Sequence, residues 1–272
     1  ALYALHLKNA PVRVFDAHNA TWKIVQRSIE QYPFFLRPFL AREAKLIRQF
    51  EQSVVQEFDH TFTVTEVDRE FLLDLFPDTE KPAIATKITS TPITIDCDQI
   101  HALPLSQASN RILTLGTLRY APNADGIRWF IQKVFPLLLE QLPDVRLTIV
   151  GKNPPADFLL AAENDPEHIE VTGYVPDLQP YYANTNVLVV PVRMGGGMRV
   201  RILEGFASGL PIVTTTIGLE GIEAVPGQDV LVEDDPQSFA EAVLIVLRDC
   251  DLRQKLSRNG RTVAESKYHW KE

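Results

Sequence analysis

The sequence predicts an α/β protein with two doubly wound, Rossmann-like domains, of which the N-terminal one is incomplete. Two observations lead to this prediction. From about Arg111 onward, short runs rich in Val, Ile and Leu alternate with helical segments, and three of these runs end in glycine. Crossover helices cover both faces of a parallel sheet, so its strands read as continuous apolar runs. A glycine at a strand end lets the chain pass close to a ligand.

The second half of the chain, residues 109–272, is expected to form one doubly wound domain. Its predicted strands are Arg111–Gly116, Arg146–Gly151, His168–Gly173, Val187–Val192, Pro211–Thr216 and Asp229–Glu233. Its predicted helices are Ala124–Gln141, Asp177–Ala183, Arg199–Ser208 and Gln237–Arg248. Pro136 should bend or divide the first of these helices, because proline cannot donate the helical hydrogen bond.

The first 108 residues contain fewer strand signals and are expected to form a partial domain plus a linker. The predicted strands are Val12–Asp16 and Thr61–Thr65, and the predicted helices are Ala20–Gln31, Pro33–Phe58 and Asp68–Leu75. Two strands do not close a doubly wound sheet, so this half resembles the later part of a domain whose opening strands are absent. The Thr/Pro/Asp-rich residues from 86 to 110 have weak periodicity and are predicted to be the inter-domain passage.

Composition excludes several classes of function. The chain has 272 residues, a net charge of −8 and a sequence pI near 5.3, which argues against nucleic-acid binding because that requires a basic face. No apolar run approaches the roughly 18 residues of a membrane-spanning helix, and no signal peptide is recognisable. Cys97 and Cys250 lack the spacing of a zinc site and favour a reducing, cytoplasmic setting.

The strongest single motif is a glycine turn that leads into a helix. Gly195, Gly196 and Gly197 follow the apolar run 187–192, and a helix is predicted to begin directly after them. Free N–H groups at a helix start favour phosphate, and Arg199 and Arg201 add positive charge there. Glu204 lies one turn beyond Arg201, where a carboxylate can reach ribose hydroxyls. In the alternative interpretation, the turn is structural and the Arg-x-x-Glu pair is a solvated ion pair.

Taken together and in order, several segments resemble the GT-B glycosyltransferases, in particular the retaining group called family 4 or group 1. They are Asp16–Asn19, Phe58–Arg69, Leu115–Gly126, Ile149–Gly151, Val171–Asp177, the glycine turn with Glu204, and Ser266–Trp270. Each is weak alone, but the ordered set is specific. The resemblance implies a hexosyltransferase that moves a sugar from a nucleotide-diphosphate sugar of the UDP or GDP type to a hydroxyl of a glycan or lipid-linked acceptor. It also implies retention of configuration, with no further cofactor and no metal.

The resemblance also makes residues 109–272 the nucleotide-sugar-binding domain and assigns residues to the donor. Glu204 would hold the ribose, and Gly173, Tyr174 and Val175 would lie against the base. The diphosphate and sugar would be met by the residues around the glycine turn and by a glycine at the first strand end. These are Gly116, Arg193, Gly195, Gly196, Gly197, Met198, Arg199 and Arg201. Arg199 and Glu204, with His18, are the catalytic candidates. His18 lies at the end of a predicted strand, where it could bond to donor or acceptor or only satisfy local backbone groups.

The chain departs from the family pattern in two places. The family often has a Glu eight residues before its second Glu, where this chain has Gly196. An Arg and a Lys that often reach the diphosphate are replaced by Thr117 and Pro122. Arg119, Arg193, Arg199 or Arg201 could supply the missing charge. The alternatives to an active transferase are an inactive GT-B nucleotide-binding partner subunit and a nucleotide-sugar epimerase of GT-B fold.

Two further segments have competing interpretations. The aromatic and basic stretch 34–42 could touch a bilayer at the cytoplasmic face of a membrane, but packing of its aromatic side chains on their own domain is the preferred interpretation. Asp96-Cys97-Asp98 mimics an Asp-x-Asp metal motif, but it lies in the linker, where a turn or a helix cap is preferred.

Overall fold

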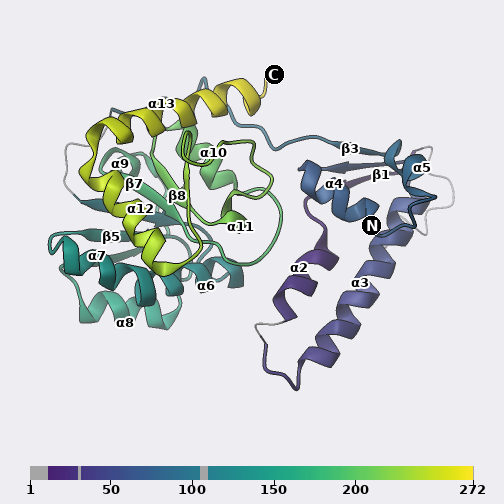
Figure 1. Cartoon of the computed structure of the whole chain (residues 1–272), viewed down its shortest axis with the longest axis horizontal. Coiled ribbons are helices and arrows are strands. Elements are labelled where there is room, and N and C mark those ends of the chain that lie inside the picture. Colours follow the sequence, from purple (N-terminus) through teal and green to yellow (C-terminus); the bar gives the residue numbers. More distant parts are fainter. Residues whose placement is uncertain (1–11, 30–31, 105–109, 272) are drawn as a thin grey trace. The chain divides into compact units, whose positions relative to one another are not determined.

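The computed structural model describes residues 12–29, 32–104 and 110–271. Its contacts divide the chain into two compact units (Figure 1). The first comprises the residues up to 93 together with 194–198 and 220–222, and the second comprises 94–193, 199–219 and the residues from 223 onward. The predicted domain boundary at residue 108 remains a prediction, whereas residues 94–104 group with the second unit.

The first unit contains a three-stranded parallel sheet in the order β1-β2-β3. Its strands are β1 (Val14–Ala17), β2 (His60–Thr63) and β3 (Ile88–Ser90). The two predicted strands are confirmed to within two residues. The prediction that everything from residue 86 is inter-domain passage was wrong at its start, because β3 lies there. This strand has one buried side chain, Ile88, in a Thr- and Ser-rich context, and its apolar signal is correspondingly weak.

Helices connect these strands. Helices α2 (Thr21–Ser28) and α3 (Arg37–Glu57) lead from β1 to β2, and α4 (Glu66–Leu73) and α5 (Lys81–Ala85) lead from β2 to β3. The first turn of α2 has no side-chain cap of its own. The buried carboxylate of Glu51 in α3 accepts from the N–H groups of Thr21 and Trp22 at 2.8 and 3.0 Å and takes this role. These bonds tie α2 to α3.

The preferred prediction for the aromatic stretch was wrong. Phe34, Phe35 and Phe39, which were expected to pack on their own domain, are 81%, 65% and 60% exposed. The side chains of α3 that do face the unit's core are Ala44, Val54 and Val55, which lie further along the helix. The sequence predicted this helix but did not show which of its side chains would be buried.

The second unit contains a six-stranded parallel sheet in the order β6-β5-β4-β7-β8-β9. The strands are β4 (Arg111–Leu115), β5 (Arg146–Val150), β6 (Ile169–Gly173), β7 (Val187–Val190), β8 (Ile212–Thr214) and β9 (Leu231–Val232). All six predicted strands are confirmed. The chain runs outward from β4 to β6 and then returns to pair β7 with the other side of β4. This reversal makes the carboxyl ends of β4 and β7 the topological switch point, where doubly wound sheets bind ligands.

The predicted helix 124–141 is divided, as Pro136 indicated. It consists of α6 (Ala121–Trp129), a π-helical turn (Phe130–Val134) and α7 (Phe135–Gln141), with the proline in the first turn of α7. Proline is compatible with a first helical turn, where no intrahelical donor is required. The interruption preserves the buried face, since Phe130, Val134 and Phe135 are all fully buried.

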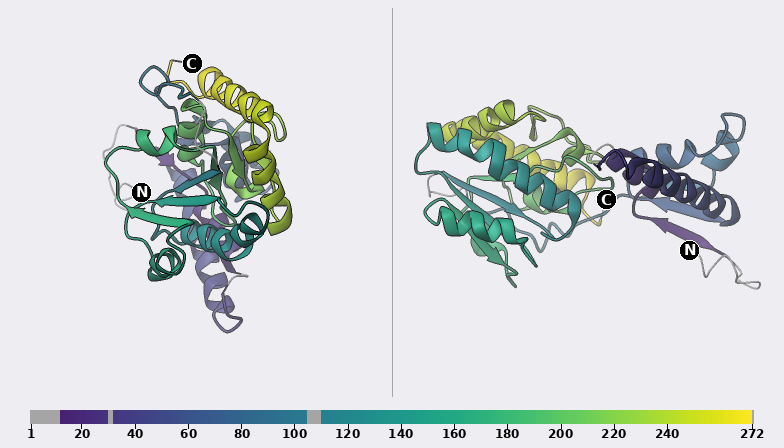
Figure 2. Two further views of the ribbon diagram at one scale, coloured as in Figure 1. Left: turned by 90° about the vertical axis from the view of Figure 1, so that its left-hand side faces the viewer. Right: turned by 90° about the horizontal axis from the view of Figure 1, so that it is seen from below.

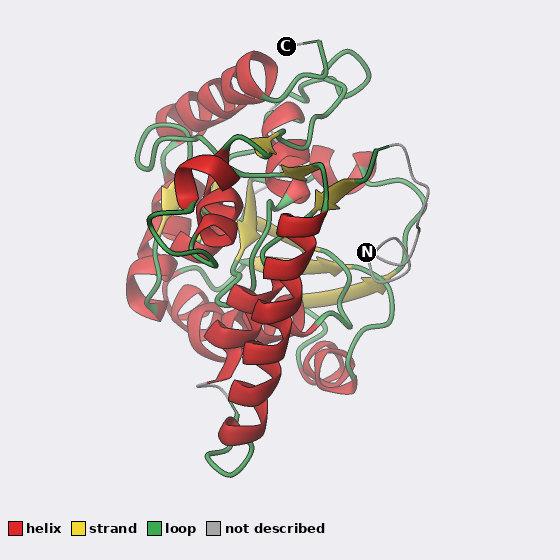
Figure 3. Ribbon diagram, turned by 90° about the vertical axis from the view of Figure 1, so that its right-hand side faces the viewer, coloured by secondary structure: helices red, strands yellow, loops and turns green. Residues whose placement is uncertain are grey.

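Helices cover both faces of this sheet (Figures 2 and 3). They are α8 (Ala156–Asn164), α9 (Gln179–Ala183), α10 (Val200–Ala207), α11 (Thr216–Leu219), α12 (Pro236–Arg248) and α13 (Cys250–Lys267). The rings of Trp129 in α6 and Phe239 in α12 meet edge to face at 5.4 Å over one face. On the opposite face, a Cβ on Gly205 would lie 2.7 Å from Leu188, so glycine allows α10 to approach β7 closely. Helices α8 and α13 were not predicted from the sequence. The sequence of α13 is largely polar, which obscures its helical periodicity.

Two smaller features complete the description. The carboxylate of Asp96 accepts from the N–H groups of Asp98 and Gln99 at 3.0 and 3.2 Å, which confirms that the Asp-x-Asp motif forms a turn cap. Of the helices in the described part of the chain, none has the length and apolar character needed to cross a membrane.

Candidate functional site

The candidate donor site lies in the second unit, at the switch point of its sheet. Gly116 directly follows β4, and the chain after β7 leads into α10, which carries Arg201 and Glu204. Parallel strands present their carboxyl ends at one edge of the sheet, so the β4 loop and the start of α10 are brought together there. The structure thus brings together Gly116, Arg201 and Glu204, three residues singled out by the sequence.

The approach of Arg201 to the β4 loop depends on glycine. A Cβ on Gly116 would lie 2.7 Å from Nη1 of Arg201, too close for a carbon and a nitrogen that are not bonded. The backbone of Gly116 also has a φ of 155°, which a residue with a side chain rarely adopts. Any larger residue at this position would therefore displace the guanidinium.

Asn123 fixes the guanidinium from the other side. Its side-chain oxygen accepts from Nη2 of Arg201 at 2.9 Å, and its amide nitrogen donates to the carbonyl of Thr117 at 3.1 Å. Asn123 is buried, and it links α10 to the loop that follows β4. This asparagine lies within one of the family-like segments, but the sequence indicated no role for it. Its function depends on a residue 78 positions away, which no local pattern reveals.

The guanidinium of Arg201 is electrostatically unsatisfied. Burial, reinforced by the nearby charge of Arg199, lowers the pKa of Arg201 to about 10, and Glu204 only partly opposes this. Arg201 therefore remains protonated at neutral pH. Its Nε atom is buried and has no hydrogen-bond partner among the residues that the structure describes. A buried cation with an unused donor is favourable for an anion, and Arg pairs with phosphate oxygens through two bonds.

Arg199 adds a second positive charge at the start of α10. It is the N-cap residue of this eight-residue helix, and its side chain makes no capping hydrogen bond. The first N–H groups of α10 are consequently not satisfied by a side chain of the cap. Two guanidinium groups beside a helix start form an arrangement that suits a diphosphate.

Glu204 lies one turn further along α10, next to Tyr182 of α9. Burial raises the pKa of Glu204, and Arg201 opposes the increase. Burial, together with the charge of Glu204, also raises the pKa of Tyr182, whose buried hydroxyl has no hydrogen-bond partner within the described ranges. Tyr182 was not predicted from the sequence. The carboxylate and the hydroxyl together offer acceptors and a donor to a polyhydroxy ligand.

Arg193 is engaged elsewhere in the same unit. Its guanidinium forms two hydrogen bonds of 3.0 Å with the carboxylate of Asp125 and lies 5.6 Å from the ring centroid of Trp129. In this arrangement its charge is already neutralised. Of the four arginines proposed from the sequence to replace the missing family cations, Arg119 belongs to the loop after β4 itself, and Arg201 reaches that loop from α10.

The carboxyl ends of β5 and β6 carry the residues predicted to meet the base. Tyr174 is 63% exposed, and Nζ of Lys152 lies 4.3 Å from the centroid of its ring. Gly173 has a φ of 72°, and a Cβ on it would meet no atom within 4 Å. Val175 is half-buried. An exposed ring beside open space is suited to stacking against a planar ligand. Lys152 was not predicted from the sequence.

The remaining predicted residues belong to the first unit. Gly195, Gly196, Gly197 and Met198 are part of the short segment that groups with it. The positive φ angles of Gly195 and Gly197, 108° and 75°, agree with a turn that needs glycine. His18 follows β1, has an exposed side chain, and lies 3.3 Å from the carboxylate of Asp16. Its catalytic role remains a prediction.

Comparisons with known proteins identify the family and the fold. Residues 109–249 match the family described as "Glycosyl transferases group 1". One relative is an uncharacterised 44.6 kDa protein from the cps region of Klebsiella pneumoniae, 23% identical over 59% of this chain and 43% of its own length. Another is the capsular polysaccharide biosynthesis glycosyltransferase CapM of Staphylococcus aureus, 26% identical over 53% of this chain and 39% of its own. The alignment thus spans about two fifths of these relatives.

Solved structures share the fold at low identity. A sucrose-phosphate synthase of Thermosynechococcus elongatus has a TM-score of 0.73 and 15% identity over 99% of this chain and 67% of its own. HepE of Anabaena, in complex with UDP-glucose, has a TM-score of 0.68 and 12% identity over 94% and 68%. TarM of S. aureus, in complex with UDP and α-GlcNAc-glycerol, has a TM-score of 0.67 and 16% identity over 82% and 43%. The chain has the two Rossmann-like units of the GT-B fold, and it belongs to the group 1 glycosyltransferases.

Proposed function

We propose that this protein is a glycosyltransferase that moves a hexosyl group from a nucleotide-diphosphate sugar to a hydroxyl of a glycan or lipid-linked acceptor. The donor would be of the UDP or GDP type and would bind to the second unit. Family membership supports the reaction class. UDP-containing complexes of two structural neighbours, HepE and TarM, support the donor class.

One observation carries the proposal: the buried guanidinium of Arg201 is held between Gly116 and Asn123 at the switch point of the sheet. Its lowered pKa and its unpartnered Nε indicate that positive charge is concentrated there in excess of what the surrounding described residues neutralise. A diphosphate would supply the missing negative charge and the missing acceptors. Glu204 is one turn away, where its carboxylate would accept hydrogen bonds from both ribose hydroxyls.

The same cations offer a chemical role during transfer. Cleavage at the anomeric carbon develops negative charge on the leaving diphosphate, and fixed cations stabilise that charge. Arg201 and Arg199 would perform this task without a divalent metal. We accordingly propose that turnover is unaffected by a chelator, and that the reaction retains the anomeric configuration, as in the family that the chain resembles.

The acceptor is proposed from the relatives. CapM is named for capsular polysaccharide biosynthesis, and the Klebsiella protein is encoded in a cps region. A growing glycan or a lipid-linked sugar at the cytoplasmic surface of a membrane is the corresponding acceptor for this chain. His18 would then position the donor sugar or the attacking hydroxyl.

Calorimetric titration with UDP, GDP, ADP and TDP tests the donor site. We expect one of the first two to bind, and the affinity to fall in Arg201→Ala and in Glu204→Ala. Turnover of the matching nucleotide sugar, followed with and without EDTA and with a glycan acceptor, tests the reaction. A folded protein that binds none of the four would contradict the proposed donor site.

Two alternative functions remain, because Gly196 stands where the family often has a glutamate near the donor sugar. An inactive partner subunit would bind the nucleotide without turnover, and an epimerase would change the sugar nucleotide without an acceptor. Product analysis with and without acceptor distinguishes all three. His18→Ala should abolish transfer while leaving nucleotide affinity unchanged.

A further inference from the structure

The α2–α3 hairpin of the first unit exposes several large apolar side chains where the chain enters α3. Phe34, Phe35, Leu36 and Phe39, which we call the aromatic tip, are 81%, 65%, 40% and 60% exposed. The rings of Phe34 and Phe35 meet edge to face at 5.8 Å, so they form one surface. Large exposed apolar patches on soluble proteins mark interaction sites.

The charge around the aromatic tip is opposite to that of the whole chain. Between residues 32 and 48 the sequence contains four cations, Arg37, Arg42, Lys45 and Arg48, against one acid, Glu43. The chain as a whole carries a net charge of −8. Cations therefore outnumber acids along the same stretch of the first unit that exposes the aromatic tip.

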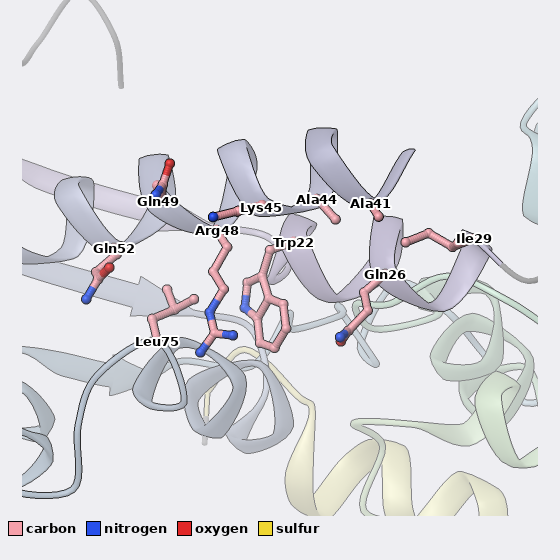
Figure 4. Close-up of a pocket in the computed structure, with 10 residues that line it drawn as sticks. All are labelled: Trp22, Gln26, Ile29, Ala41, Ala44, Lys45, Arg48, Gln49, Gln52 and Leu75. Atoms are coloured by element: carbon pink, nitrogen blue, oxygen red, sulfur yellow. The ribbon is translucent and has the colours of Figure 1, made fainter. Parts of the chain in front are cut away.

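A groove between α2 and α3 adjoins this region (Figure 4). It has a volume of about 530 Å³, and its polar lining consists of Lys45, Arg48 and the three glutamines at positions 26, 49 and 52. The guanidinium of Arg48 lies over the ring of Trp22 at 5.1 Å from its centroid. None of the described residues that line the groove is acidic. Ammonium, guanidinium and amide donors are the groups that bind phosphate oxygens.

We propose that the aromatic tip docks on the surface of an anionic phospholipid bilayer. Its rings lie among the interfacial parts of the lipids, and the surrounding cations face the headgroup phosphates. Stable attachment of a peripheral protein requires two signals, and apolar side chains with adjacent basic residues provide both. The charge argues against a second copy as the occupant, because a symmetric contact would bring like charges together.

Vesicle sedimentation of the intact protein tests this proposal. We expect binding to phosphatidylcholine vesicles that contain phosphatidylglycerol, little binding to phosphatidylcholine alone, and weakening by salt. Phe34→Ser/Phe35→Ser should lower the partition coefficient roughly tenfold or more, since it removes the apolar signal. Arg42→Gln/Lys45→Gln should also lower it roughly tenfold or more, but only on anionic vesicles.

Matched controls come from the second unit. Leu159→Ser/Leu160→Ser removes two apolar side chains that are 43% and 55% exposed on α8. Lys255→Gln/Arg258→Gln removes two exposed cations from α13. Both should bind vesicles as the unsubstituted protein does, and circular dichroism checks that every variant is folded.

Site-specific contact is measured with Phe34→Trp and brominated lipids. Quenching of the additional fluorescence places this residue in the bilayer, whereas its absence on bound vesicles overturns the assignment to the aromatic tip. Failure of the intact protein to bind anionic vesicles also overturns it. A dimer that Phe34→Ser/Phe35→Ser dissociates, without vesicle binding, would assign the surface to a second copy instead. None of these readouts depends on nucleotide binding, so the proposed donor site can fail or hold independently.

Discussion

Replacing Arg201 by methionine should weaken nucleotide binding and, at the same time, stabilise the unliganded fold. Burial and Arg199 lower the pKa of Arg201 to about 10 from an ordinary value of 12.5. A lowered pKa of a cation means that its charged form is disfavoured in the folded state. At about 1.4 kcal/mol for each tenfold change in the protonation equilibrium, this amounts to about 3 kcal/mol at neutral pH.

One loss offsets part of this gain. Methionine cannot donate to Asn123, and the released amide oxygen would cost about 1–2 kcal/mol if it stayed unsatisfied. The net expectation for Arg201→Met is an unfolding free energy about 1–2 kcal/mol higher than that of the unsubstituted protein. Hydrogen bonds from a guanidinium to a phosphate contribute about 1.5–3 kcal/mol, so the Kd of the nucleoside diphosphate should rise roughly ten- to 150-fold.

Urea denaturation and calorimetric titration of the same variant measure the two effects. Arg128→Met is the matched control. Arg128 forms two bonds of 2.6 and 3.1 Å with Asp157, and these bonds raise its pKa. Its loss should lower stability slightly and leave the affinity unchanged. The reasoning would be refuted if Arg201→Met bound the nucleotide as tightly as the unsubstituted protein, or if it lost stability while Arg128→Met did not.

The remaining predictions concern the residues around this cation. Gly116→Ala should reduce nucleotide affinity about as much as Arg201→Met, because its Cβ would lie 2.7 Å from the guanidinium; a titration of both variants compares them. Glu204→Gln should weaken donor binding. Because burial raises the pKa of Glu204, stability is reduced as the pH rises through that pKa, and the substitution should flatten this acidic part of the stability–pH profile in thermal unfolding. With a nucleotide sugar as ligand, affinity for the unsubstituted protein should fall as the pH is lowered and Glu204 becomes protonated, and this dependence should be absent in the variant. Tyr174→Ala should lower affinity roughly five- to 100-fold if the base stacks on its ring, whereas Tyr174→Phe should bind normally; equal binding of all three proteins would exclude stacking.

Much of the second unit could be predicted because its signals are local. The strands β4, β7 and β8 are runs of largely buried residues rich in Val, Ile and Leu, and Pro136 divides its helix where the sequence indicated. The short β3 has a single apolar residue beside Thr and Ser, and α13 has a largely polar sequence, so neither gave such a signal and both were missed. Their positions are determined by pairing with other elements and not by their own periodicity.

The site shows the same limit. The residue types that suit a phosphate were recognisable at Arg199, Arg201 and Glu204 from their order after a glycine turn. The sequence could not distinguish Arg201 from Arg193, because the difference lies in long-range partners: Asn123 for one and Asp125 for the other. The exposure of the aromatic tip could not be predicted either. An aromatic run at the start of a helix has the same sequence pattern whether or not its own domain covers it.

The topology of the sheet explains why a cation from α10 can replace one from the β4 loop. At the switch point, the loop after β4 and the helix after β7 end beside the same space, so either element can deliver positive charge to a ligand there. In this chain, Gly116 of the loop lets the guanidinium approach, and Asn123 at the start of α6 accepts a hydrogen bond from it. A lysine in the loop would place a second cation next to Arg201, whose pKa Arg199 already lowers. The buried charge of Arg201 therefore takes the place of the family cations that are absent at positions 117 and 122, and a further cation there would be unfavourable.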